Sequence, residues 1–149
     1  MFIEQIYTNC IAEAAYYIES NGEAAIIDPL RDIEVYLQMA KSRGATIKYI
    51  LETHFHADFV SGHIDLSLAT GAPIIFGPGA KTAYEIKNVK DQEVLPLGLT
   101  QIKVLHTPGH TPACVTYLVG DAAFVGDTLF MPDYGTARAD FPGGDAATL

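Results

Sequence analysis

The chain has 149 residues, of which 49% are hydrophobic and 18% charged, as in compact domains with an apolar core. Its net charge of −9 and its nine dispersed basic residues argue against a nucleic acid or an anionic membrane as partner, because such surfaces are bound through Lys and Arg clusters. The two cysteines show no paired spacing, so the sequence does not predict a disulfide-stabilised fold. We expect one domain over residues 1–149.

The N-terminal part of the chain is expected to begin with three strands, over 3–7, 14–18 and 24–27. Asn21 and Gly22 separate the last two, and this pair predicts a tight hairpin because both residues tolerate positive φ. Apolar residues at helical spacing predict a helix over 31–42, with Gly44 as its C-cap.

The remainder of the chain continues to alternate strands with helical patterns. A helix is expected over 64–69, ending at Gly71, and strands are expected over 46–51, 73–76, 102–105, 115–119 and 122–125. Polar loops follow the C-terminal ends of at least three of these strands. The pattern predicts an α/β fold, in which such loops carry functional sites.

The first residues of the chain lack the features of an export signal. No basic region is followed by an apolar one at residues 1–5. No apolar stretch approaches the roughly 18–20 residues that a membrane-spanning helix needs. The sequence therefore predicts a cytoplasmic protein.

All five histidines fall in two short stretches of the chain, a clustering that a random distribution of histidines would not be expected to give. The stretches are 53–63 and 106–111, and the histidines are His54, His56, His63, His106 and His110. Imidazole and carboxylate groups that converge from separate loops are the usual way to hold a catalytic transition metal. The clustering therefore predicts a metal site.

Residue spacing suggests which side chains share that site. His54 and His56 are two residues apart at a predicted strand end, so an extended chain turns both rings to one side, and Asp58 continues this register. His110 follows a Pro-Gly turn, and Asp127 follows the last predicted strand. We take these five residues as candidate metal-site groups.

Three motifs in order resemble those of the metallo-β-lactamase superfamily. They are Thr-His-Phe-His-Ala-Asp at 53–58, Thr-Pro-Gly-His-Thr at 107–111 and Gly-Asp-Thr-Leu at 126–129. The resemblance implies an αββα sandwich with the metal site at one edge. Domains of this family normally continue well beyond the Gly-Asp motif, so it also implies that the C-terminal part of the fold is lacking after Leu149.

Phe59 marks a departure from the binuclear hydrolases of this family, such as glyoxalase II, which carry His-x-His-x-Asp-His. Phenylalanine cannot bind a metal, so one ligand of a second metal is missing. The one-metal set that remains is His54, His110 and Asp127, which matches the two-histidine, one-carboxylate triad of non-haem iron oxygenases. His56 and Asp58 are then expected to orient the ligands or to serve a second metal.

The chain is similar to the persulfide dioxygenases of this superfamily. Residues 53–63 resemble the branch often fused to rhodanese domains, and residues 127–141 resemble a β-lactamase-like hydrolase branch linked to sulfide and persulfide handling. The resemblance implies one Fe(II) per chain, with Zn as the alternative, and O₂-dependent oxidation of glutathione persulfide or a similar persulfide to sulfite and thiol. It places Arg138, Asp140 and Tyr134 in the active-site loop and makes a rhodanese domain or protein an expected partner.

Two alternatives stay open at this point. The first is a metal-dependent hydrolase, a thioesterase of glyoxalase II type, which needs metal-bound hydroxide instead of O₂. The second is a non-catalytic, incomplete domain that exposes apolar surface and associates with a partner or with itself as a homo-oligomer. Turnover of a thioester without oxygen would favour the first, and a molten or aggregated sample would favour the second.

Overall fold

The computed structural model describes residues 1–149, which divide into two compact units. The first unit comprises 1–52, 56–75 and 96–101, and the second comprises 53–55, 76–95 and 102–149. Neither of the two α-helices has the length and apolar character that crossing a membrane requires.

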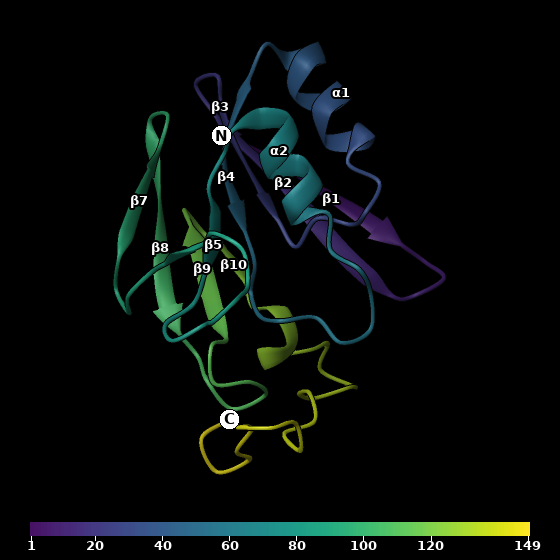
Figure 1. Ribbon diagram of the computed structural model, residues 1–149, viewed down its shortest axis with the longest axis vertical. Helices are drawn as coiled ribbons and strands as arrows, with labels where there is room; N and C mark the ends of the chain where they lie inside the picture. The colour runs from purple at the N-terminus through teal and green to yellow at the C-terminus, as the bar shows by residue number, and fades with distance from the viewer. The chain divides into compact units, whose positions relative to one another are not determined.

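Six strands form one sheet in the order β1-β2-β3-β4-β5-β6. The first five are labelled in Figure 1. Their bounds are β1 Phe2–Thr8, β2 Glu13–Ser20, β3 Glu23–Ile27, β4 Thr46–Leu51, β5 Ile74–Phe76 and β6 Lys87–Asn88. The pairs β1–β2 and β2–β3 are antiparallel, whereas β3–β4 and β4–β5 are parallel. The turn between β2 and β3 has positive φ at both Asn21 and Gly22, which confirms the predicted hairpin.

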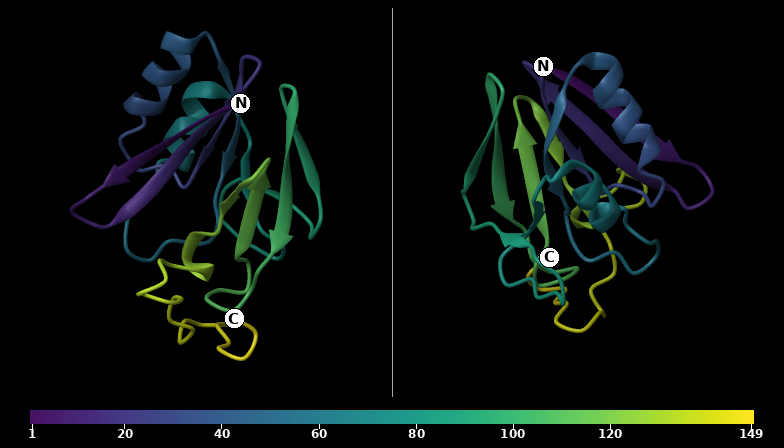
Figure 2. Two further views of the ribbon diagram at one scale, coloured as in Figure 1. Left: turned by 180° about the vertical axis from the view of Figure 1, so that it is seen from behind. Right: turned by 45° about the horizontal axis from the view of Figure 1, so that its top comes forward.

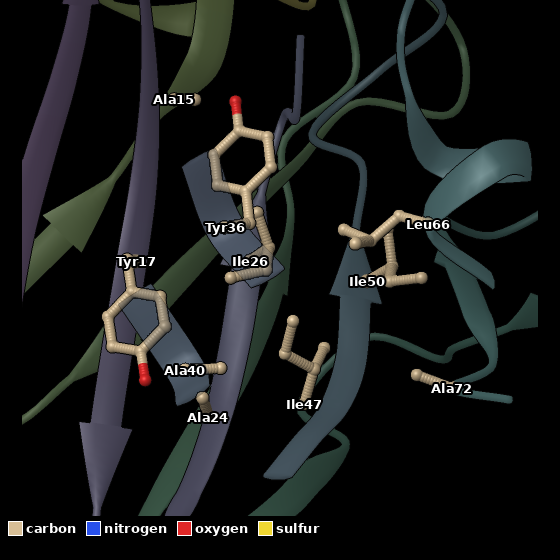
Figure 3. Packing of buried hydrophobic residues seen from close by; sticks show 10 residues of the cluster. All are labelled: Ala15, Tyr17, Ala24, Ile26, Tyr36, Ala40, Ile47, Ile50, Leu66 and Ala72. Carbon is tan, nitrogen blue, oxygen red and sulfur yellow. The ribbon is translucent and has the colours of Figure 1, made fainter. Parts of the chain in front are cut away.

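Both α-helices belong to the first unit and contribute to its core (Figure 3). They are α1, Glu34–Arg43, and α2, His63–Thr70, and each ends at a glycine in the left-handed conformation, Gly44 or Gly71, as predicted. The core cluster joins apolar residues of β2, β3, β4 and both helices with Ala72, which precedes β5: Ala15, Tyr17, Ala24, Ile26, Tyr36, Ala40, Ile47, Ile50, Leu66 and Ala72. Burial of these side chains fixes the strand from whose end the first histidine loop starts.

Four strands form the second sheet, in the order β10-β9-β8-β7. Their bounds are β7 Val94–Leu97, β8 Thr100–His106, β9 Val115–Val119 and β10 Ala122–Phe124. A short 3₁₀ turn, η1 at Gly126–Thr128, follows β10, and the chain then continues as loops to Leu149 (Figure 2). These elements place the second histidine loop, between β8 and β9, and the Gly-Asp motif in the second unit.

Two strands, β6 and β7, were not predicted. β6 has only two residues, both exposed, so it carries no apolar pattern. β7 contains Pro96, and a proline is not expected in a central strand. β7 accommodates it because β7 lies at the edge of its sheet, where Pro96 is exposed between the buried Leu95 and Leu97. The helix predicted over 31–42 begins later, at Glu34, whose backbone N–H donates to Asp32 Oδ1 over 3.2 Å.

Candidate metal site

Three of the predicted metal ligands converge in the second unit. Asp127 Oδ2 lies 3.7 Å from His54 Nε2 and 3.4 Å from His110 Nε2. One ligand atom from each of the three residues lies within 4.8 Å of the other two, a spacing at which one metal ion can be held. Both imidazoles are buried, whereas the Asp127 side chain is 37% exposed, so the site is open on its carboxylate side.

The three residues come from three separate places in the chain. His54 lies just after β4, His110 in the loop between β8 and β9, and Asp127 in η1. β4 ends at Leu51, so the chain is no longer extended at His54 and His56, and strand alternation does not govern their directions. The two rings accordingly have different partners, and only His54 joins His110 and Asp127.

The second ring nitrogen of each imidazole is engaged away from Asp127. His110 Nδ1 donates a hydrogen bond to the backbone carbonyl of Arg138 over 2.7 Å. His54 Nδ1 lies 2.9 Å from the hydroxyl of Thr53. A hydrogen on Nδ1 leaves the lone pair of Nε2 available, and the Arg138 carbonyl, which can only accept, requires this tautomer of His110. The Thr53 hydroxyl can donate or accept, so it is compatible with the same tautomer of His54.

Aromatic packing also fixes the His110 ring. The Phe141 ring meets it edge to face, with centroids 5.1 Å apart and an interplanar angle of 87°. The rings of His54 and His110 are 4.9 Å apart at 80°. Sequence reasoning gave Phe141 no role of its own, because no local spacing relates it to His110.

Gly126 lies against the side chain of Thr53. Its φ is +51°, and a Cβ built on it would overlap Oγ1 and Cβ of Thr53. Any side chain at this position would therefore displace the threonine that contacts His54. The Gly-Asp motif thus combines a residue without a side chain with the candidate carboxylate ligand, Asp127.

His56 belongs to a second group of possible metal ligands, in the first unit. Its Nε2 lies 3.1 Å from Asp28 Oδ1 and 3.2 Å from Glu52 Oε2, and all three side chains are at least nine-tenths buried. Burial opposes protonation of His56, but the two carboxylates outweigh it and raise its pKa to about 11. Phe59, which departs from the His-x-His-x-Asp-His pattern expected from the sequence resemblance, packs its ring against His56 with centroids 4.3 Å apart.

Glu52 and Glu13 extend this buried polar group. Glu52 Oε1 accepts a hydrogen bond from Ser61 over 2.6 Å and lies 3.2 Å from His63 Nδ1. Both carboxylate oxygens of Glu13 are buried without a hydrogen-bond partner. Burial first, and then the charge of Asp28, raises the pKa of Glu13 to about 7. Spacing identified His56 as a candidate but not its partners Asp28, Glu52 and Glu13, since these come from distant segments.

The remaining predicted site residues are exposed. Asp58 lies on the surface of the first unit, and Tyr134 is 78% exposed in the second. Arg138 donates two hydrogen bonds of 2.6 Å to Asp140, which lower the pKa of that carboxyl to about 2. The Arg138 guanidinium also lies 5.0 Å from the centre of the Phe141 ring. This pair lies in the short segment whose carbonyl and aromatic ring contact His110.

The donor set in the second unit suits a transition metal. Two imidazole nitrogens and one carboxylate oxygen are borderline ligands that bind iron and zinc alike. The buried rings have fixed directions, and the exposed carboxylate side leaves room for further ligands. The residues present therefore fit a single metal ion with open coordination positions.

Comparison with known proteins identifies the relatives of the chain. The sequence matches the family model of the Metallo-beta-lactamase superfamily over residues 9–85 and 76–149. It is 36% identical to a probable metallo-hydrolase of Burkholderia pseudomallei, in an alignment that covers 94% of this chain and 62% of the relative. The chain spans 37–62% of the length of the first curated relatives that it matches.

Two solved structures resemble the chain over nearly its whole length. ETHE1 from Myxococcus xanthus is 28% identical, with a TM-score of 0.90, and the match covers 99% of this chain and 66% of that one. TTHA1623, solved in a di-iron-bound form, is 25% identical, with a TM-score of 0.80, and the match covers 97% of this chain and 81% of that one. The predicted fold class is confirmed by the family match.

Proposed function

We propose that this chain, which belongs to the metallo-beta-lactamase superfamily, binds one Fe(II) through His54, His110 and Asp127 and acts as a persulfide dioxygenase. Its substrate would be glutathione persulfide or a similar low-molecular-weight persulfide, which O₂ and one water convert to sulfite, the thiol and two protons. The observation that carries the proposal is the convergence of two imidazole Nε2 atoms and one carboxylate oxygen within 4.8 Å. This set has the composition of the facial triad of non-haem iron oxygenases.

The residues around the triad have separable tasks. The Arg138 carbonyl accepts from His110 Nδ1 and keeps its Nε2 free for the metal, and the Thr53 hydroxyl engages His54 Nδ1. Burial of both imidazoles restrains their rings, and the partly exposed Asp127 leaves an approach for small molecules. The iron would supply the redox chemistry of the reaction, and the protein would supply geometry and open coordination positions.

Likeness to other members of the superfamily supports a metal-dependent enzyme. Members of the superfamily are metalloenzymes. The likeness to ETHE1 supports the dioxygenase, and TTHA1623 was solved with iron in a related fold. Phe59 further favours a mononuclear site, since a ligand of the second metal is replaced by a side chain that cannot bind one.

A metal-dependent hydrolase, such as a thioesterase of glyoxalase II type, is the second candidate. The relationship to a probable metallo-hydrolase favours it. This reaction would use a metal-activated water in place of O₂ and would proceed with zinc. Oxygen dependence therefore separates the two proposals.

Metal content and oxygen uptake of protein purified without oxygen test the proposal. We expect about one iron per chain, and O₂ uptake on addition of glutathione persulfide that His110→Ala abolishes together with iron binding. The matched control is His106→Ala, because the His106 ring contacts the Pro112 carbonyl and not Asp127. If the purified protein instead contains zinc and hydrolyses a thioester in the absence of O₂, the hydrolase is the correct assignment and the dioxygenase proposal is wrong. Full iron binding by His110→Ala would refute the ligand set.

A further inference from the structure

Three threonine hydroxyls meet in the second unit, where three elements come together. Thr107 directly follows β8, Thr116 lies in β9, and Thr128 is the last residue of η1. Thr107 Oγ1 lies 3.2 Å from Thr116 Oγ1 and 3.2 Å from Thr128 Oγ1, so Thr107 is the middle member. A hydroxyl has one donor and two acceptor positions, and Thr107 can therefore donate to one neighbour and accept from the other.

The contact between Thr107 and Thr128 joins the two segments that carry His110 and Asp127. His110 follows Thr107 by three residues, and Asp127 directly precedes Thr128. A second, longer contact of 3.5 Å leads from the Thr128 hydroxyl to the Thr107 carbonyl. The separation of 3.4 Å between His110 Nε2 and Asp127 Oδ2 thus depends on how these two segments are held together.

Asp127 depends on its backbone for its position. Its carboxylate contacts the imidazoles of His54 and His110, and no backbone N–H or hydroxyl donates to it. The turn that carries it has only three residues. On one side the turn is held by the loop that follows, through Ala137 N–H to the Asp127 carbonyl over 3.3 Å. On the other side it is held by the Thr107 hydroxyl.

We propose that Thr107 is a positioning residue of the metal site: its hydroxyl, set between those of Thr116 and Thr128, places the Asp127 turn at ligand distance from His110. The proposal rests on the one-metal function proposed above. Thr107 acts through Asp127 and touches neither metal nor substrate. Replacement of groups that orient metal ligands typically lowers metal affinity about 10–100-fold.

Co(II) titration of purified protein tests this role without any assay of activity. Co(II) affinity is measured by chelator competition, and its visible absorption bands report coordination geometry. Thr107→Val keeps the shape of the side chain and removes the hydroxyl, and we expect weaker Co(II) binding by about 10-fold or more with altered bands. Thr107→Ser keeps the hydroxyl and should restore both. Thr82→Val is the matched control, since the Thr82 hydroxyl donates to the Tyr84 carbonyl and contacts none of these residues.

If Thr107 only stabilised the fold, Thr107→Val would change the melting temperature and leave Co(II) binding unchanged. A folded Thr107→Val protein with wild-type Co(II) affinity and absorption bands therefore overturns the proposal. If Thr107→Val does not fold, Thr128→Val gives the same comparison, because it removes the other partner and leaves Thr107 and Thr116 in contact. In folded variants, the effects of the two replacements should be non-additive. Wild-type protein that binds no Co(II) would overturn the one-metal function as well, whereas an unchanged Thr107→Val overturns the role of Thr107 only.

Discussion

Gly126 lies so near Thr53 that a Cβ added to it would overlap the threonine Oγ1, and the absence of a side chain on Gly126 leaves room for the threonine that contacts His54. Gly126 also has a φ of +51°, in the left-handed region that favours glycine. Gly126, beside the candidate ligand Asp127, therefore meets two separate requirements: a left-handed backbone conformation, and space for the Thr53 side chain. Substitutions at Gly126 and at a glycine with only the first requirement separate the two.

Gly126→Ala is expected to lower both stability and metal affinity. The left-handed conformation costs a residue with a Cβ about 1–2 kcal/mol, and displacement of Thr53 moves His54 away from Asp127. Gly44→Ala is the control, because Gly44 has a φ of +67° and no atom lies within 4 Å of the point that an added Cβ would occupy. Urea unfolding and Co(II) titration of both variants check this. Equal losses of stability with unchanged Co(II) affinity in Gly126→Ala would contradict the role of Thr53.

Glu13 is expected to make the protein less stable as the pH rises from about 4.5 to about 7. Burial, and then the charge of Asp28, raises the pKa of Glu13 in the folded protein from 4.5 to about 7. The folded state therefore binds the proton more tightly than the unfolded chain in this window, and stability present below pH 4.5 is lost as the pH passes through 7. The full shift corresponds to roughly 3 kcal/mol, which screening at the partly exposed side chain reduces to about 1–2 kcal/mol.

Glu13→Gln stays neutral and should lose this pH dependence. Its stability relative to the wild type is expected to increase by about 1–2 kcal/mol between pH 4.5 and pH 8, as measured by urea unfolding at several pH values. Glu4→Gln, at an exposed position of β1, is the control and should follow the wild type at every pH. A constant difference between Glu13→Gln and wild type across this range would show that Glu13 titrates normally.

Local patterns predicted much of the fold correctly. The Asn21-Gly22 hairpin and the glycines that end both helices depend on backbone conformations that few other residues adopt, so neighbouring residues are enough to identify them. The clustering of histidines likewise pointed to the segments that carry His54 and His110, and the place of Asp127 after the last predicted strand pointed to the third residue of the group. Whether these three bind a metal is still a prediction.

Long-range relationships could not be predicted from spacing. The partners of His56 are Asp28, at the end of β3, and Glu52, after β4, and their meeting depends on how these strands are paired. The contact of Thr107 with Thr128 depends on the packing of a turn against a strand end. Short or proline-containing edge strands such as β7 were missed because an edge strand needs no continuous apolar pattern.

Phe59→His is expected to raise the zinc stoichiometry from about one towards two per chain. The change completes the His-x-His-x-Asp-His pattern that the sequence resemblance associates with binuclear hydrolases, and it replaces the ring that packs on His56 by a metal-binding imidazole. Phe59→Leu, which removes the ring without adding a ligand, is the control and should retain one zinc. Zinc is measured by elemental analysis after dialysis against a weak chelator. A single zinc in folded Phe59→His would show that the second metal is excluded by more than this residue.

Arg138 and Asp140 are expected to act as one unit that holds the segment in contact with His110. Their side chains are exposed and bind each other through two hydrogen bonds, while His110 binds the Arg138 carbonyl and not its guanidinium. Arg138→Ala and Asp140→Asn should therefore lower Co(II) affinity by similar factors, and the double variant should do no worse than either. Melting temperatures should stay near the wild type, because an exposed ion pair contributes little to stability. If the guanidinium instead binds substrate, Arg138→Ala will raise KM and Asp140→Asn will leave KM unchanged. That pattern would show that Arg138 recognises the persulfide and does not hold the loop.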